Sequence, residues 1–282
     1  MNKVKFFINY SGYCLANVKH VIKGEKSKLI KFNALYALIS HPDKGYILFD
    51  TGYTRRFYDA TKSYPNKIYA NETKVTITKS NEVKSQLESI GIKAEEIKHI
   101  IISHFHADHI GGLKDFKNAN IYCSKKSYNQ VKSINNFFAF SKGILKDLIP
   151  IDIETRLKFI EDISVKKEDE IFQEKYDLFQ DQTIMIYNLP GHAAGQIGIL
   201  LNTLKNKYFL ISDACWDIRA ITNKKLPNKI VRLFFDSWQD YICSIENIKR
   251  FKKINPEITL IPSHCSKTTD ILISEKLDIN VL

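Results

Sequence analysis

The sequence lacks the features that mark membrane and secreted proteins. Its 282 residues contain no apolar run near the roughly 18 residues that a membrane-spanning helix needs. The first ten residues hold no apolar run of signal-peptide length. The five cysteines (Cys14, Cys123, Cys215, Cys243 and Cys265) form no C-x-x-C pair. These absences predict a cytoplasmic protein without a membrane partner, whose cysteines are free thiols buried as small apolar residues.

Arginine is also scarce. The chain carries 42 lysines and arginines against 31 acidic residues, a net charge of +11, but only six of these cations are arginines. Base recognition and bidentate phosphate binding depend on arginine, and the lysines are scattered along the whole chain. We therefore interpret the charge as a solvated surface and expect no nucleic-acid partner. The oligomeric state stays open.

Alternating and continuous apolar patterns predict a mixed α/β protein. The sequence shows neither internal repeats nor a boundary, so we expect one domain over residues 1–282. Residues 124–174 are interpreted as a helical insertion, in which the charged run 166–170 is a solvated connection. The predicted strands cover 29–39, 46–50, 99–103, 183–187, 196–201, 207–212 and 258–261, and the predicted helices cover 81–90 and 236–252.

Three of the eight histidines lie within six residues, directly after the strand 99–103. The segment reads His104-Phe105-His106-Ala107-Asp108-His109 and is followed by Gly111-Gly112. At an extended strand end, His104 and His106 share one face and Phe105 turns into the core. The chain must then bend to bring Asp108 and His109 to the same place, and we expect the two glycines to supply backbone freedom for this bend.

Further potential ligands follow later strands: His192 after 183–187, Asp213 after 207–212 and His264 after 258–261. A lone histidine is usually a hydrogen-bonded core residue, but this combination favours a metal site. A structural zinc site usually recruits cysteines, whereas nitrogen and oxygen ligands are typical of a catalytic site that keeps room for water. The pattern predicts two divalent ions, with zinc expected and iron or manganese as alternatives, sharing a bridging hydroxide as nucleophile.

These motifs resemble those of the metallo-β-lactamase superfamily, over nearly the whole chain. The resemblance rests on the 104–112 loop, Pro190-Gly191-His192, Ser212-Asp213, Ser263-His264 and the earlier Phe49-Asp50-Thr51-Gly52. It implies a four-layer αβ/βα sandwich with a two-metal site at one sheet edge. It further implies that His104, His106 and His192 hold one ion, that Asp108, His109 and His264 hold the other, and that Asp213 bridges them. Asp50 would orient a ligand histidine, although the alternative for that motif is a plain turn.

Within the superfamily, the sequence looks most like the N-acyl homoserine lactonase group. This implies a hydrolase of a small ester-like substrate, preferably a lactone or an acyl ester, with Asp108 carrying a proton to the leaving group. Those lactonases usually place a tyrosine three residues after the bridging aspartate, where this chain has Trp216. Trp216 and Tyr53 are the predicted substrate contacts. A phosphodiesterase, a glyoxalase II-like thioesterase and a metal-containing regulatory protein without turnover remain alternatives.

Overall fold

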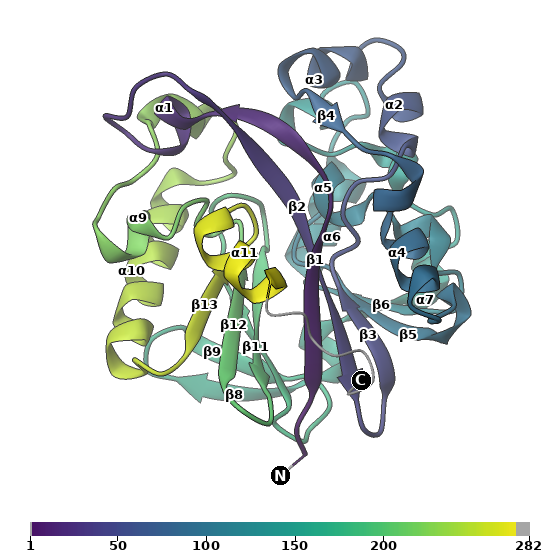
Figure 1. Ribbon diagram of the computed structural model, residues 1–282, viewed down its shortest axis with the longest axis vertical. Helices are drawn as coiled ribbons and strands as arrows, with labels where there is room; N and C mark the ends of the chain where they lie inside the picture. Colours follow the sequence, from purple (N-terminus) through teal and green to yellow (C-terminus); the bar gives the residue numbers. More distant parts are fainter. Residues whose placement is uncertain (1, 275–282) are drawn as a thin grey trace.

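The computed structural model describes residues 2–274, which form two β-sheets flanked by helices (Figure 1). The seven-stranded sheet has the order β4 (Val75–Thr76), β1 (Lys5–Asn17), β2 (Leu29–His41), β3 (Gly45–Phe49), β5 (Ile97–Ile101), β6 (Asn120–Cys123) and β7 (Leu157–Phe159). The six-stranded sheet has the order β13 (Thr259–Pro262), β12 (Lys207–Ser212), β11 (Ile197–Asn202), β10 (Ile184–Asn188), β9 (Gln173–Asp177) and β8 (Val165–Asp169).

Short helices connect most strands, and α10 is the longest helix of the described chain. The α-helices are α1 (Val18–Val21), α2 (Arg56–Ala60), α3 (Asn66–Glu72), α4 (Val83–Ser89), α5 (Ala107–Ile110), α6 (Lys125–Ser133), α7 (Ile153–Arg156), α8 (Ile160–Ile163), α9 (Arg219–Thr222), α10 (Trp238–Ile254) and α11 (Ser266–Ser274). The 3-10 turns are η1 (Lys79–Asn81), η2 (Ala94–Glu96), η3 (Leu113–Asp115), η4 (Ala139–Lys142), η5 (Lys146–Leu148) and η6 (Lys229–Leu233). Within residues 2–274, no helix combines the length and the apolar character needed to span a membrane.

Each sheet is apolar on both faces, which explains the layered arrangement. In β2, Tyr36 and Leu38 join the core beneath α2, α4, α5 and α6, whereas Ala37 and Ile39 join the core between the two sheets. In β10, Ile186 faces the core between the sheets, and its neighbours in sequence face α9 and α10. Successive side chains of a strand point to opposite faces, so each sheet is covered on both sides. The result is the expected four-layer αβ/βα sandwich, with α10 on one flank and α2–α7 on the other (Figure 1).

Strand direction brings the predicted site residues to one edge. β3, β5 and β6 are mutually parallel, and β12 is parallel to β13, so the carboxyl ends within each set share an edge. β10 and β12 are both antiparallel to β11 and therefore run in the same direction. A hydrogen bond from the Ile197 amide to the Ser103 carbonyl (3.0 Å) joins the start of β11 to the end of β5 and thus links the two sheets at this edge.

Two sequence predictions need correction. The interval 124–174 is not a helical insertion throughout: its helices lie in 125–163 with the strand β7 among them, and the charged run 166–170 forms most of β8, which pairs with β9. Charged side chains on a strand that pairs with a single neighbour remain solvated, so polarity alone did not reveal the strand. The cysteines are free as predicted, but only three are buried, since Cys14 is half-buried and Cys243 is exposed.

Candidate metal centre

Seven predicted ligands converge where the strands end. His104 and His106 follow β5, and Asp108 and His109 lie on the single turn of α5. As predicted, Phe105 points away from them into the core and is 2% exposed. The others follow β10, β12 and β13. Three overlapping groups have potential ligand atoms within 4.8 Å of one another: His104, His106 and His192; His104, His109 and Asp213; and Asp108, His109 and His264.

Asp213 lies between the two outer groups. Its Oδ2 is 3.0 Å from His264 Nε2 and 3.3 Å from His192 Nε2, and its Oδ1 is 3.5 Å from His109 Nε2. Asp108 Oδ2 is 3.4 Å from both His109 Nε2 and His264 Nε2. One carboxylate therefore faces histidines of both groups, while the other faces histidines of one group. The roles that the resemblance implies, with Asp213 shared by two ions and Asp108 on one of them, stay a prediction.

In His104, His109 and His264, the ring nitrogen that points away from the cluster forms a hydrogen bond with the protein. His109 Nδ1 donates to Asp50 Oδ2 at 2.7 Å, and His264 Nδ1 donates to the Asn33 carbonyl at 2.9 Å. His104 Nδ1 lies 3.0 Å from Ser103 Oγ, which itself donates to Asp50 Oδ2. Hydrogen bonds of this kind set the tautomer and the ring orientation of metal-binding histidines. Each ring thus directs its other nitrogen, Nε2, into the cluster.

Several atoms that point into the cluster have no hydrogen-bond partner among the described residues. They are His104 Nε2, His109 Nε2 and Asp213 Oδ1, all fully buried. Buried polar atoms are normally hydrogen-bonded, because an unpaired one costs about 1–3 kcal/mol. Imidazole nitrogens and a carboxylate oxygen in this state form a donor set that suits zinc or another divalent transition metal. The residues present therefore fit the implied ions.

Burial and charge divide the histidines into two classes. Burial lowers the pKa of His104 well below 6.5, that of His106 to about 4 and that of His192 to about 3. Burial also acts to lower the pKa of His109 and His264, but nearby carboxylates outweigh it and raise both above 6.5. Burial therefore favours the neutral form of three rings, and the nearby carboxylates favour the protonated form of the other two.

This division predicts that metal loading near pH 6.5 releases protons from His109 and His264. Both pKa values lie above 6.5 in the metal-free protein, whereas a metal-bound imidazole must be neutral. Affinity should consequently weaken as the pH falls. Calorimetric titration in buffers of different ionisation enthalpy measures the proton count, and an enthalpy that does not depend on the buffer would contradict the prediction.

Positive backbone angles mark the chain next to the cluster. Asp50 (φ 59°) and Ser212 (φ 49°) occupy the left-handed region immediately after β3 and at the end of β12, a conformation that non-glycine residues seldom adopt. Gly111 and Gly112, by contrast, have ordinary negative φ values. A Cβ at Gly111 would lie 2.5 Å from the Gly52 carbonyl oxygen. The predicted backbone freedom is therefore wrong, because the two glycines permit close approach of the loop after β3.

The two predicted substrate contacts already have protein partners. The Trp216 indole N–H donates to Asp213 Oδ2 at 3.1 Å, and its ring packs against His192 and Phe235. Tyr53 is 2% exposed and hydrogen-bonds with Cys14 and with Tyr69 of α3. Their roles toward a substrate stay predictions.

Sequence reasoning missed Tyr69, Ser103 and Phe32. Burial, and after it the charge of Asp108, raises the pKa of Tyr69 well above 10, and the side chain is partly exposed. Phe32 stacks on His264 with ring centroids 4.6 Å apart. Of these three residues, only Ser103 could have been found from the sequence, because it is next to His104. The other two come from segments distant in sequence.

A further His/Asp group, His41, Asp43 and Asp181, lies at the β2–β3 hairpin. His41 Nδ1 accepts from the amides of Asp43 and Lys44, so Nε2 carries the proton that it donates to Asp181 at 2.9 Å. Both ring nitrogens are engaged, and neither has a free lone pair for a metal. This group is a hydrogen-bonded hairpin anchor.

Curated relatives with detectable sequence similarity include N-acyl homoserine lactonases. The enzyme AttM of Rhizobium radiobacter is 23% identical over 180 residues, which is 64% of this chain and 62% of that protein. The chain thus matches somewhat less than two thirds of the length of that relative. The N-acyl homoserine lactonase of Bacillus cereus is 22% identical over 221 residues, which is 78% of this chain and 76% of that protein.

Solved structures share the fold over almost the full length. An N-acyl homoserine lactone hydrolase with N-hexanoyl-L-homoserine bound at its metal centre superimposes with a TM-score of 0.75 at 18% identity, covering 95% of this chain and 96% of that one. A probable metal-dependent hydrolase from Staphylococcus aureus gives a TM-score of 0.70 at 14% identity, covering 94% and 90%. The family model of the metallo-β-lactamase superfamily matches residues 31–214. The chain therefore belongs to the metallo-β-lactamase superfamily.

Proposed function

We propose that this protein is a dinuclear metal-dependent hydrolase of a small ester-like substrate, with lactones of the N-acyl homoserine type or acyl esters preferred. The observation that carries the proposal is the position of Asp213, which lies between two groups of histidines at one sheet edge. Each of these imidazoles is either neutral or can lose its extra proton when a metal binds. The lactonase names of the sequence relatives support the choice of substrate class. Zinc is the preferred ion on donor chemistry, with iron or manganese as alternatives.

When bound, two such ions lower the pKa of a shared water toward neutrality and polarise the substrate oxygen. The chain's own residues hold the site in order. Asp50 keeps the proton of His109 on Nδ1, and the Asn33 carbonyl does the same for His264, so both Nε2 atoms stay available. Trp216 fixes the orientation of the Asp213 carboxylate.

Asp108 is the proposed proton carrier to the leaving group. Burial acts to raise the pKa of Asp108, but in the metal-free protein the positive charges of His109 and His264 outweigh it and lower the pKa to about 2. At neutral pH this carboxylate is ionised and can accept a proton at the cluster before passing it on. Tyr69 is partly exposed, whereas Tyr53 is almost fully buried. The charge of Asp108 acts on the phenols of both tyrosines, so each is a candidate for the hydroxyl toward a substrate carbonyl that Trp216 lacks.

The proposal is tested by metal analysis together with a substrate panel. Purified protein is loaded with zinc, manganese or iron and assayed on N-acyl homoserine lactones, p-nitrophenyl esters, thioesters and bis-p-nitrophenyl phosphate. We expect two ions per chain and the fastest turnover on lactones or esters. Activity confined to the phosphodiester would overturn the substrate class, and two bound ions without any turnover would support the regulatory alternative.

The variant Trp216→Phe separates two roles of the indole. It keeps an aromatic ring but removes the N–H donor to Asp213, and a hydrogen bond to a charged group is worth about 1.5–3 kcal/mol. If the indole orients Asp213, metal affinity should fall about tenfold or more. Chelator competition measures this loss. An unchanged affinity with a raised KM would instead assign Trp216 to the substrate.

A further inference from the structure

One turn of the helical segment 125–156 lies directly on a proposed metal ligand. We call residues 139–143, which comprise η4 and Gly143, the insertion turn. Gly143 has a left-handed backbone (φ +69°), and a Cβ there would lie 2.7 Å from His106 Cδ2 and 3.0 Å from its Nε2. Real Cβ atoms do not approach other atoms this closely. Only glycine therefore lets the turn lie flat against the imidazole.

The insertion turn also hydrogen-bonds to this ligand. The His106 ring donates to the Lys142 carbonyl, and the Ala107 amide donates to the Gly143 carbonyl at 3.3 Å. The other ring nitrogen, Nδ1, faces His192 Nε2 at 3.0 Å within the cluster. His106 therefore presents Nδ1 to the cluster, whereas His109 and His264 present Nε2. The partner that sets this orientation comes from a segment more than 30 residues downstream.

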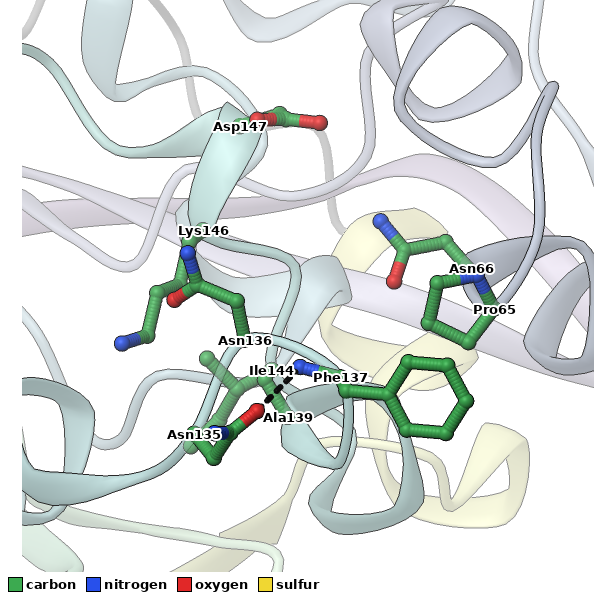
Figure 2. A pocket seen from close by; sticks show the side chains of 9 residues that line it. All are labelled: Pro65, Asn66, Asn135, Asn136, Phe137, Ala139, Ile144, Lys146 and Asp147. Carbon is green, nitrogen blue, oxygen red and sulfur yellow. Dashed lines mark hydrogen bonds between the residues drawn. The ribbon is translucent and has the colours of Figure 1, made fainter.

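The position of the insertion turn depends on a few anchors. Ala139 and Ile144 are each 2% exposed in the core beneath the helices, and the Ile144 amide closes the turn on the Ala139 carbonyl at 3.1 Å. Lys142 Nζ donates across the site to the Phe235 carbonyl at 3.2 Å. On the side toward α3, a cavity of about 420 Å³ separates the turn from Pro65 and Asn66 (Figure 2). Ala139 and Ile144 border this cavity.

We propose that the insertion turn is a positioning element for the metal centre, in which Gly143 and the Lys142 carbonyl hold His106 with Nδ1 directed at the ion. The proposal rests on the proposed metal centre. If the proposal is correct, metal binding by His104, His106 and His192 depends on the insertion turn. A side chain at 143 would meet the imidazole, so it should displace the turn and loosen its hold on the His106 ring.

The test compares Gly143→Ala with Gly91→Ala in the full chain. Gly91 also has a positive φ (+85°), but a Cβ there has nothing within 4 Å, so this control matches the backbone strain without the contact. Cobalt(II) titration, followed by absorption and by chelator competition, reports each ion separately. We expect one of the two ions to bind about 10–100-fold more weakly in Gly143→Ala, with an altered cobalt spectrum, and no such change in Gly91→Ala.

Equal cobalt affinities and spectra in the two variants would overturn the positioning role. Failure of the unsubstituted protein to bind cobalt would instead refute the metal centre itself, so the two failures are distinguishable. If Gly143→Ala does not fold, Lys142→Met serves in its place. That change removes the anchor to the Phe235 carbonyl but keeps the backbone carbonyl. It should weaken the same ion, and an unchanged affinity would again contradict the proposal.

Discussion

Asp213→Ala should lose both metal ions and at least about 100-fold in kcat/KM. Changes to groups that merely orient a ligand commonly cost 10–100-fold in affinity or activity, and Asp213 is placed to be a ligand itself. Its carboxylate lies 3.0 Å from His264 Nε2 and 3.3 Å from His192 Nε2, in different ligand groups. Elemental analysis after dialysis, together with lactone or ester hydrolysis, measures both effects.

Asp217→Asn is the matched control for this variant. Asp217 lies four residues further along the same loop and is paired with Arg219, at 2.9 Å. It belongs to none of the clustered groups. Its loss should leave metal content unchanged. Full metal content and activity in Asp213→Ala would refute the proposed mechanism.

Asp50→Asn should lower the binding affinity for one of the two ions about 10–100-fold. Asp50 is 1% exposed and accepts from the Ser103 amide, the Ser103 hydroxyl and His109 Nδ1. An asparagine amide offers one oxygen where the carboxylate offers two. His109 then loses the acceptor that keeps its proton on Nδ1, and a proton on Nε2 blocks metal binding. Chelator competition with zinc measures the affinity.

Asp177→Asn controls for the loss of a buried carboxylate. Asp177 is also 1% exposed, and its carboxylate accepts hydrogen bonds from the Gln182 backbone amide and from the Lys167 ammonium group. It sits on β9, among none of the clustered groups. Both variants should lower the melting temperature, but only Asp50→Asn should change zinc affinity. Equal zinc affinity in the two variants would mean that Asp50 is a plain turn residue and does not orient a ligand histidine.

Local patterns predicted much of the fold because they act over a few residues. The apolar run 207–212 is the strand β12 as observed, and the pattern at 236–252 is close to α10. The strand β8 was missed because its residues are mostly charged. Such side chains are stable on a strand that pairs with one neighbour and stays in contact with water, so the pairing with β9 compensated for their low β-propensity.

The sequence by itself determined which side chains stand at the strand ends, since ligand type and the position of each motif after a strand are local properties. His104, His192 and Asp213 could be identified in this way. Only the tertiary structure decided that His109 directs Nδ1 at Asp50, that His264 directs Nδ1 at the Asn33 carbonyl, and that Gly143 lies on His106. The physical reason is that these contacts join segments distant in sequence, which meet only when two sheets and their helices pack together.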